Sequence, residues 1–265
     1  MSVSEGRSPV VDVFSRSAAN YEQLGVEYFT PMGRALVERA GIRPGMRVLD
    51  VGCGRGHVLF PAAEATGPSG AVVATDLAEG MVSLTAAAAA HLPWVTVGLG
   101  DAGAPDHPDG AFDALLAGLV IFFLPSPEDA LAAYRRVLRP GGRLAFSTFG
   151  SQDPVLQTVV KTLASFAPPS EGEPPADRFR DPASIASLLA GWSGVEITEH
   201  PVETRFSGKP LFWDWLWSHG IRVLLEQIPA DRLDEARAAI HAVLPEAPFS
   251  LHTVLRVTTA VRPSP

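Results

Sequence analysis

Cysteine is almost absent from this sequence. The single cysteine, Cys53, has no partner for an intramolecular disulfide, so a disulfide-stapled secreted scaffold is excluded. No uninterrupted apolar run reaches about 18 residues, the length that a membrane-spanning helix needs. The nearest approach, residues 111–125, contains Asp113 and Gly118. Residues 1–9 lack the apolar core of a signal peptide and are expected to be disordered, and we predict a cytoplasmic protein without a membrane partner.

Basic residues are few and scattered. The chain has 21 Lys and Arg residues against 29 Asp and Glu residues, so its formal net charge is -8. The longest basic run is the pair Arg135–Arg136, whereas binding of a phosphate backbone needs a basic face. We therefore expect no nucleic-acid partner. Histidine, cysteine and acidic residues do not recur at metal-ligand spacing, so we also expect no metal site.

What the chain does have is a regular alternation of strand-like and helix-like segments. Hydrophobic residues make up 46% of its 265 residues, enough for a sizeable core. Strands are expected at 48–51, 71–75, 95–97, 112–117 and 143–149, with helices between them at 58–65, 79–91 and 127–138. Such alternation predicts a parallel sheet with helices on both faces and a ligand at the carboxyl ends of the central strands.

A glycine-rich loop follows the first expected strand. Its residues, Asp50-Val51-Gly52-Cys53-Gly54-Arg55-Gly56, resemble a dinucleotide fingerprint, but His57 stands near the place where the last glycine of that motif belongs. Asp50 would repel a pyrophosphate and attract a cation. The loop therefore favours a nucleoside that carries positive charge, and S-adenosylmethionine (SAM) fits this description. Asp50 could instead cap its own loop by accepting backbone hydrogen bonds.

Two further carboxylates follow the next strands. Asp76 ends the second strand, 20 residues after the last loop glycine, where an acidic side chain can reach a ribose hydroxyl. Asp101 follows the third strand. Because the carboxyl ends of parallel strands meet at one edge of the sheet, we expect Asp50, Asp76 and Asp101 to line the same site.

Residues 48–56 resemble the first motif of class I SAM-dependent methyltransferases, and the order of parts over 46–150 is similar to theirs. The resemblance implies that Asp76 binds both ribose hydroxyls, and that Asp101 and the Ala102 amide meet the adenine. It departs from the commoner family pattern at 118–124, an almost wholly apolar loop, so no catalytic polar group is carried over there. The cofactor-binding residues that we expect are Tyr21, Asp50, Gly52, Cys53, Gly54, Asp76, Leu77, Met81, Asp101, Ala102 and Ala117.

The fold expected from this resemblance is α/β: a doubly wound, seven-stranded, mostly parallel sheet with an N-terminal helical lid and a helical cap inserted before the last strand. Alternating patterns at 195–206 and 249–261 would supply the last two strands. The divisions that we predict are 1–40, the helical lid; 41–150, the SAM-binding core; 151–206, lid helices and a strand; 207–248, the aromatic helical cap; and 249–265, the final strand.

The predicted cap is rich in aromatic residues. Phe212, Trp213, Trp215 and Trp217 lie in a helical segment, and residues at i and i+2 point to different sides of a helix. Some of these rings should therefore face a cavity. His219 is the candidate general base, because imidazole titrates near neutrality, although a structural histidine is the alternative. The substrate pocket that we expect is lined by Phe29, Phe122, Trp213, Trp217 and His219.

These features predict a methyltransferase that acts on an O, N or C nucleophile of a small, hydrophobic or aromatic metabolite. Bacterial secondary metabolism is the expected setting, and a monomer or homodimer the expected state. Two alternatives stay open: a cyclase or isomerase that uses SAM as a bound cation, and a binding module without chemistry. The apolar loop at 118–124 is compatible with the first alternative, while the aromatic cap argues against the second.

Overall fold

The computed structural model describes residues 9–19, 21, 24–168, 177–179 and 181–264. All but the last of residues 1–9, which we expected to be disordered, lie outside this part of the chain. Among the described residues, no helix is long and apolar enough to cross a membrane, and no group of three or more His, Cys, Asp or Glu side chains is placed to hold a metal ion.

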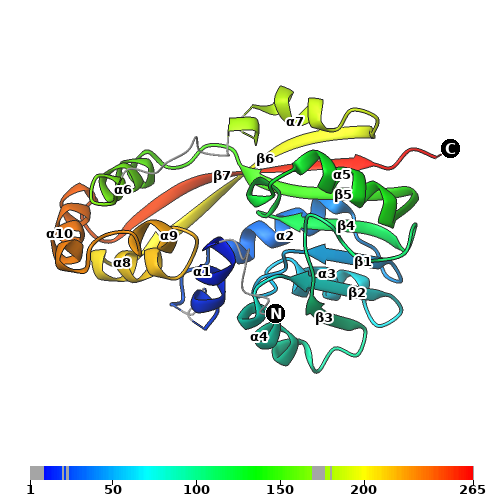
Figure 1. Ribbon diagram of the computed structural model, residues 1–265, viewed down its shortest axis with the longest axis horizontal. Helices are drawn as coiled ribbons and strands as arrows, with labels where there is room; N and C mark the ends of the chain where they lie inside the picture. The colour runs from blue at the N-terminus through cyan, green and yellow to red at the C-terminus, as the bar shows by residue number, and fades with distance from the viewer. Residues whose placement is uncertain (1–8, 20, 22–23, 169–176, 180, 265) are drawn as a thin grey trace, which may run out of the picture.

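A seven-stranded sheet forms the centre of the molecule (Figure 1), with the strand order β3-β2-β1-β4-β5-β7-β6. Its strands are β1 Arg47–Val51, β2 Ala71–Asp76, β3 Val95–Leu99, β4 Phe112–Gly118, β5 Leu138–Phe149, β6 Ser193–Phe206 and β7 Phe249–Val261. β7 pairs antiparallel with both of its neighbours, while the pairs among β1 to β5 are parallel. The predicted seven-stranded, mostly parallel α/β sheet is confirmed.

Helices cover both faces of this sheet. They are α1 Pro9–Ser17, α2 Phe29–Ala40, α3 Leu59–Thr66, α4 Glu79–Ala89, α5 Pro127–Val137, α6 Pro154–Ala164, α7 Pro182–Leu188, α8 Lys209–Trp217, α9 Arg222–Leu225 and α10 Leu233–Val243. Three of them start in the same way, with proline at the first position and Ser126, Asp153 or Asp181 accepting a hydrogen bond from a backbone amide of the first turn. Proline needs no amide partner there, and the cap satisfies one of the others.

Two expected helical segments are shorter than the hydrophobic pattern indicated. α1 ends at Ser17, so Tyr21 and Leu24 lie outside it although their spacing fits a helix. The predicted helical cap, 207–248, is divided into α8, α9 and α10. Gly220 and Pro229 fall at the two interruptions, where glycine weakens a helix and proline removes an amide donor.

β1 occupies the middle of the sheet and is buried on both faces. Val48, Leu49, Asp50 and Val51 are each 0% exposed. Val48 belongs to the apolar core on the α2 and α3 side of the sheet, and Leu49 to the core on the α5 side. A continuous apolar run is what a parallel strand covered on both faces requires, so an acidic residue in β1 is an exception that needs a reason.

The two strands at one side of the sheet extend into an arm. β7 pairs with β5 as far as Leu255, opposite Phe149, while β6 and β7 stay paired out to Phe206 and Phe249. Figure 1 shows α6, α8, α9 and α10 gathered around this β6–β7 arm. Buried and exposed residues alternate over the end of β6, as the sequence pattern predicted, because successive side chains of a strand point to opposite faces.

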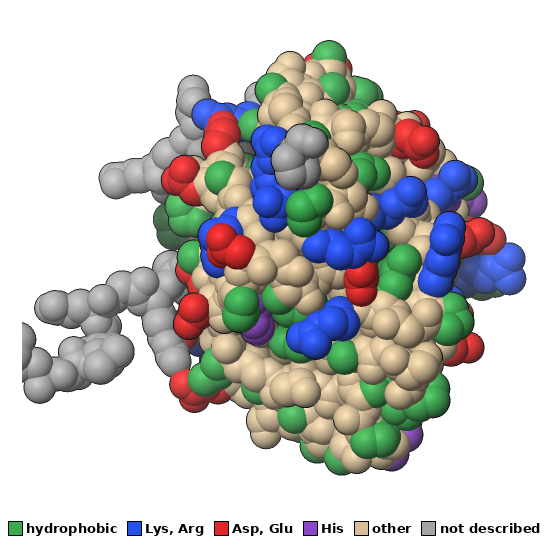
Figure 2. All heavy atoms as spheres, turned by 90° about the vertical axis from the view of Figure 1, so that its right-hand side faces the viewer, with side chains coloured by type: hydrophobic (Ala, Val, Ile, Leu, Met, Phe, Trp, Pro, Cys, Tyr) green, Lys and Arg blue, Asp and Glu red, His purple; other side chains and the backbone are tan. Residues whose placement is uncertain are grey.

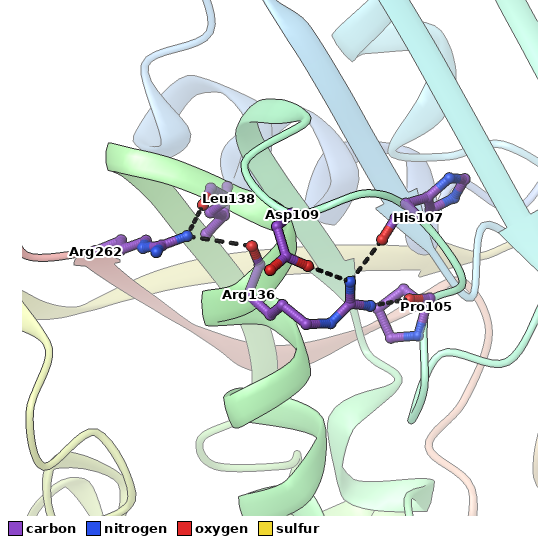
Figure 3. Close-up of polar contacts among 6 residues, drawn as sticks. All are labelled: Pro105, His107, Asp109, Arg136, Leu138 and Arg262. Atoms are coloured by element: carbon purple, nitrogen blue, oxygen red, sulfur yellow. Dashed lines mark hydrogen bonds and ion pairs between the residues drawn. The ribbon is translucent and has the colours of Figure 1, made fainter.

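The edge at which the parallel strands begin is tied together by arginines. Arg136 donates to Asp109 and to the carbonyls of His107 and Pro105 in the β3–β4 loop, and Arg262 donates to the carbonyls of Arg136 and Leu138 (Figure 3). Figure 2 shows Lys and Arg side chains gathered on this side of the molecule. Arg136 and Arg262 bond to backbone carbonyls, and Arg136 also to the Asp109 side chain, so these two residues close the loops of this edge.

Candidate active site

The opposite edge, where the parallel strands end, carries the three acidic residues singled out in the sequence. Asp50 lies in β1 opposite Ala74 of β2, and Asp76 ends β2 opposite Leu99, the last residue of β3. Asp101 follows two residues after β3. The negative charge of Asp76 acts on the pKa of Asp50, so these two carboxyl groups are close neighbours. The predicted grouping at one edge agrees with the structure.

The glycine-rich loop after β1 is fastened on two sides. Cys53 N donates to Thr75 O at 2.9 Å, Gly54 N donates to Asp76 Oδ2 at 2.8 Å, and Thr85 Oγ1 donates to Gly54 O at 2.7 Å. Gly54 has φ 50°, in the left-handed region that favours glycine. A Cβ there would meet no described atom within 4 Å, so this side of the loop is open to a ligand.

Asp50 is fully buried, and neither of its carboxyl oxygens has a hydrogen-bond partner among the described residues. Burial, and then the charge of Asp76, raise the pKa of Asp50 well above its usual range. Backbone capping of the loop by Asp50, the alternative left open by the sequence, is therefore wrong. A buried carboxyl without a partner is costly, and a cationic ligand group at this edge would offset the cost.

Asp76 holds the glycine-rich loop and can accept further hydrogen bonds. Its Oδ2 accepts from Gly54 N and its Oδ1 from Ala78 N, both at 2.8 Å. Burial raises the pKa of Asp76, while the amides of Ala78, Gly54 and Leu77 act in the opposite direction. A carboxylate offers about four acceptor positions, so two hydroxyl groups can still be accommodated. Leu77 and Leu99 are 46% and 61% exposed beside it, and present apolar surface to a flat ring.

The other predicted cofactor contacts differ in accessibility. Asp101 is exposed, and its Oδ1 accepts from Gly103 N at 2.7 Å. Ala102, Met81 and Ala117 are 5%, 1% and 0% exposed, so their side chains belong to the core, and the backbone is the part of Ala102 and Ala117 that could contact a cofactor. Cys53 is buried too, and burial raises the pKa of its thiol well above the usual range, as expected for an apolar filler.

The β4–α5 loop approaches the glycine-rich loop closely. A Cβ on Gly52 would lie 2.6 Å from Cγ2 of Val120, so only glycine fits there. The neighbouring Leu119 has φ 53°, which costs about 1 kcal/mol or more for a residue with a side chain. Its amide is held by Ser147 Oγ at 3.1 Å. No sequence signal marked this strained residue, which sits where β4 ends at the site.

The predicted lid contacts the glycine-rich loop through aromatic rings. Tyr21 stacks on Phe29 with 5.1 Å between ring centroids, and both rings lie within 6 Å of His57. His57 Nδ1 is also 3.2 Å from Thr30 Oγ1. Tyr21 therefore packs against its neighbours and borders the loop at the same time, so the packing interpretation and the lid interpretation are compatible.

An ion-pair cluster joins α1 of the lid to α9 of the cap. Arg16 Nη2 lies 2.5 Å from Glu226 Oε2, and Arg222 Nε lies 2.7 Å from Glu226 Oε1. The hydrogen bond from Arg16 is the main cause that lowers the pKa of Glu226. Arg16 and Arg222 thus share the carboxylate of Glu226. The pair with Arg16 joins residues that are 210 positions apart in the chain.

Glu226→Gln is expected to speed SAM dissociation by roughly 2- to 5-fold, because a partly exposed ion pair contributes only about 0.2–1 kcal/mol. Stopped-flow measurement at low salt would check this, and the difference from wild type should shrink in high salt. Glu235→Gln is the matched control, since Glu235 pairs with Arg232 at 3.4 Å in the α10 region, away from the lid. Equal dissociation rates for both variants would contradict a role of Glu226 in lid closure.

His219 lies in the cap, 6% exposed, with its Nδ1 2.7 Å from the carbonyl of Trp215. A carbonyl only accepts, so Nδ1 carries the proton, and in the neutral ring Nε2 is the basic nitrogen. Ring contacts connect His219 to Trp215 at 4.1 Å, to Phe29 at 6.0 Å and to Tyr28 at 6.2 Å. His219 therefore packs against Tyr28 and Phe29, two residues of the predicted lid.

The aromatic wall contains residues that sequence reasoning missed. Tyr28 contacts Trp215 at 5.2 Å and Phe149 at 6.5 Å, and Phe149 contacts Phe122 of the β4–α5 loop at 5.9 Å. Trp215 could have been found, because the sequence already placed it in the aromatic helical segment next to His219. Tyr28 and Phe149 carried no such signal.

Trp213 and Trp217, two of the predicted pocket residues, lie beside each other on α8. They contact each other at 6.4 Å, and the Arg222 guanidinium lies 6.0 Å from the Trp217 ring. Phe212 and Trp215 pack instead against Phe206 of β6. The residue of α8 whose ring contacts both Tyr28 and His219 is Trp215, and His219 itself lies two residues beyond the end of α8.

Comparison with known proteins agrees with this geometry. The family model of the methyltransferase domain matches residues 49–146. The chain is 39% identical over 251 residues to nocamycin O-methyltransferase of Saccharothrix syringae, covering 88% of each chain. It is 41% identical over 150 residues to aklanonic acid methyltransferase DauC of Streptomyces sp. strain C5, covering 56% of this chain and 68% of that protein.

Solved structures share the fold at low identity. YcgJ of Bacillus subtilis is 16% identical with a TM-score of 0.59, over 88% of this chain and 99% of that one. A Haemonchus contortus phosphoethanolamine N-methyltransferase 2 in complex with SAM is 17% identical with a TM-score of 0.62, over 98% and 61%. The [4+2]-cyclase SpnF is 23% identical with a TM-score of 0.55, over 89% and 82%.

The edge of the sheet suits SAM in its polar and apolar groups. Asp50 offers a buried carboxyl without a described partner, Asp76 has acceptor positions left over, and Gly54 leaves its side of the loop open. The ammonium group and the ribose of SAM match the two carboxyl groups in that order, and the open side of the loop lets the ligand approach the backbone. The chain therefore belongs to the class I SAM-dependent methyltransferases.

Proposed function

We propose that this enzyme transfers the methyl group of SAM to an oxygen nucleophile of a hydrophobic, aromatic metabolite of bacterial secondary metabolism. The observation that carries the proposal is the buried, unpartnered Asp50 beside an acceptor side walled by aromatic rings. The names of the two relatives support it, since one is an O-methyltransferase and the other acts on an acid, aklanonic acid.

The residues of the edge divide the work of holding SAM, which when bound supplies an electrophilic methyl on a positive sulfur. Asp50 takes the ammonium group and Asp76 the ribose hydroxyls, while Asp101 and the Ala102 amide take the adenine between the exposed Leu77 and Leu99. Gly52, Cys53 and Gly54 allow the backbone to approach, and Met81 and the backbone of Ala117 support it. Tyr21 closes the site from the lid.

The acceptor side mainly has to position a nucleophile, because alignment accounts for much of the barrier in a displacement at carbon. Phe29 and Phe122 border this side, together with Tyr28, Phe149 and Trp215. Trp213 and Trp217 remain candidates for contact with the acceptor only in the outer part of the cap. A carboxylate acceptor is already ionised at neutral pH and needs no base, whereas a hydroxyl acceptor needs one, and His219 is the base that we assign.

Methyl transfer can be tested with SAM that carries an isotopic label in its methyl group. Incubating the protein with methyl-labelled SAM and a panel of aromatic carboxylic acids and phenols, aklanonic acid included, should give a labelled O-methyl product. The runner-up is a non-methylating cyclase or isomerase, favoured by the apolar β4–α5 loop and by the fold shared with SpnF. Consumption of acceptor without transfer of label would replace the first function with the second.

His219→Asn is expected to lower kcat for a phenolic acceptor by about 100-fold, a usual loss for a general base. SAM affinity and kcat for a carboxylate acceptor should stay within about 2-fold. Initial rates over pH 5.5–9 would check this, since the variant should lose the acid limb of the profile. His200→Asn, on β6 where His200 pairs with Thr198, is the control. A parallel loss for both acceptor classes would make His219 a packing residue.

We also propose that the protein works in the cytoplasm as a monomer or homodimer, without nucleic acid, and that the lid, core and cap divisions given above act as units. The single buried cysteine and the net charge of -8 support the first part of this statement. Sedimentation of the purified protein with and without SAM would measure the oligomeric state.

A further inference from the structure

The β4–α5 loop and the segment that follows β1 interlock through two glycines. The two strands that lead into them, β1 and β4, are paired neighbours in the sheet. A Cβ on Gly52 would lie 2.6 Å from Cγ2 of Val120. A Cβ on Gly118 would lie 2.6 Å from Cγ2 of Val58, the residue before α3. Each segment therefore packs a valine against a glycine of the other, so a shift of one disturbs the other.

The chain reaches this arrangement through a strained backbone conformation at Leu119. This residue lies between Gly118 and Val120 and has φ 53°, and it is the one residue other than glycine with a positive φ in the described part of the chain. Its side chain packs against the core on the α2 and α3 side of the sheet, whereas Val120 packs against the core on the α5 side. Because a Cβ disfavours the left-handed conformation, another interaction has to hold Leu119 there.

Ser147 of β5 supplies that interaction. It lies opposite Gly118 at the end of the β4–β5 pairing and is 2% exposed, and the Leu119 amide donates to its Oγ at 3.1 Å. Without this acceptor the half-buried amide would lose its hydrogen bond. Leu119 would then relax to an ordinary backbone conformation, and Val120 would turn away from Gly52.

The same stretch of β5 supports the loop a second time. Val120 precedes the short helix η1, Ile121–Phe123. The ring of Phe122 in this helix lies 5.9 Å from the ring of Phe149. Phe149 follows Ser147 by two residues in β5, so both side chains point to the same face of the strand. One face of β5 thus holds the β4–α5 loop at its beginning and in η1.

We propose that Ser147 is a positioning residue for the cofactor site. Through the Leu119 amide it keeps Val120 against Gly52, and so holds the glycine-rich loop in the conformation that binds SAM. This inference rests on the proposed function and adds to it a residue that acts through another residue.

The glycine-rich loop needs this support because its hydrogen bonds to β2 and α4 start only at Cys53 and Gly54. Gly52, the residue before them, packs against the side chain of Val120. A protein that populates its binding conformation only in part binds with an affinity reduced by that fraction. Loss of the Ser147 hydroxyl should therefore weaken cofactor binding although no predicted cofactor contact is removed.

A double-mutant cycle on Ser147 and Leu119 tests the proposal, with calorimetry of SAM and S-adenosylhomocysteine binding to the full-length protein. Ser147→Ala should weaken the binding of both by about fivefold, the effect of one lost hydrogen bond. In the Leu119→Gly background the same change should cost about twofold or less, because glycine adopts the left-handed conformation without support. In the Leu119→Ala background the cost should stay at about fivefold, because alanine loses the leucine packing as glycine does but keeps the Cβ.

Thr66→Val is the matched control for general stability. Thr66 is 0% exposed, and its hydroxyl donates to the Ala62 carbonyl at 2.6 Å. Its own carbonyl accepts from the amide of Gly45, which precedes β1, so it lies at the opposite edge of the sheet. The variant should lower the melting temperature, as Ser147→Ala does, and leave both affinities within about twofold of wild type.

Leu119→Val, with Ser147 intact, gives a second measurement. A β-branched residue resists a positive φ more strongly than leucine does, so cofactor affinity should fall by about fivefold or more.

Two results would overturn the proposal: SAM affinity of Ser147→Ala within about twofold of wild type, or equal costs of this change in the Leu119→Gly and Leu119→Ala backgrounds. The second result would make Ser147 a packing residue. The proposed function fails separately, when no labelled product forms, because the affinities of the cycle are measured without an acceptor.

Discussion

Asp76→Ala is expected to weaken SAM binding by at least about 100-fold. Two hydrogen bonds from ribose hydroxyls to a carboxylate are worth about 1.5–3 kcal/mol each. The alanine also releases the Gly54 and Ala78 amides, so the loop loses its anchor at the same time. Titration calorimetry with SAM and with S-adenosylhomocysteine would measure both affinities, and both should fall together because the ribose is common to them.

A loss of general stability must be separated from this loss of binding. Asp113→Ala is the matched control, since Asp113 likewise accepts from a backbone amide, that of Arg47 at 2.7 Å, and pairs with Arg139 at 2.6 Å, but lies at the opposite edge of the sheet. It should be destabilised yet bind SAM normally. Asp76→Asn keeps one acceptor oxygen and should bind with intermediate affinity. A loss below about 5-fold for Asp76→Ala would remove Asp76 from the cofactor site.

Asp50→Asn is expected to stabilise the ligand-free protein and weaken SAM binding. The burial that raises the pKa of Asp50 means that its ionisation opposes folding, so removing the charge should raise Tm by about 4–8 °C, for a gain of about 2 kcal/mol. The ammonium group of SAM would lose its counter-charge, and the affinity should fall by about 10- to 100-fold. Thermal melts with and without SAM would show both effects in one experiment.

The raised pKa of Asp50 decides in which direction stability and SAM affinity change with pH. The folded protein holds the Asp50 proton more tightly than the unfolded chain, so the stability from this group is fully present below the ordinary Asp pKa of about 3.9 and is lost as pH rises through the raised folded pKa. SAM affinity should change in the opposite direction and increase as Asp50 ionises. Asp50→Asn should flatten both trends. A variant that binds SAM like the wild type across this range would exclude contact with the ammonium group.

Much of the fold, and the position of Asp50 and Asp76 at one edge of the sheet, could be predicted because their signals are local. Alternation of strand and helix places Asp50 and Asp76 at the same edge once the strands are parallel, and no long-range detail is needed. A glycine at position 54 indicates a left-handed backbone conformation, and the structure has one there. The aromatic contacts lacked such signals: the tryptophan that contacts Tyr28 is Trp215, almost 190 residues later in the chain.

The sequence by itself determined the layered α/β sheet, the carboxylates at its edge and the cationic nucleoside that they suit, because hydrophobic period, glycine and charge act over a few neighbouring residues. Only the tertiary structure decided that Asp50 is left without a partner among the described residues, that Glu226 joins α1 to α9, and that Tyr28 packs against Trp215. These facts depend on which distant segments pack together. That packing follows from the register of β6 with β7 and the angle of the cap, and neither is encoded in a short stretch of chain.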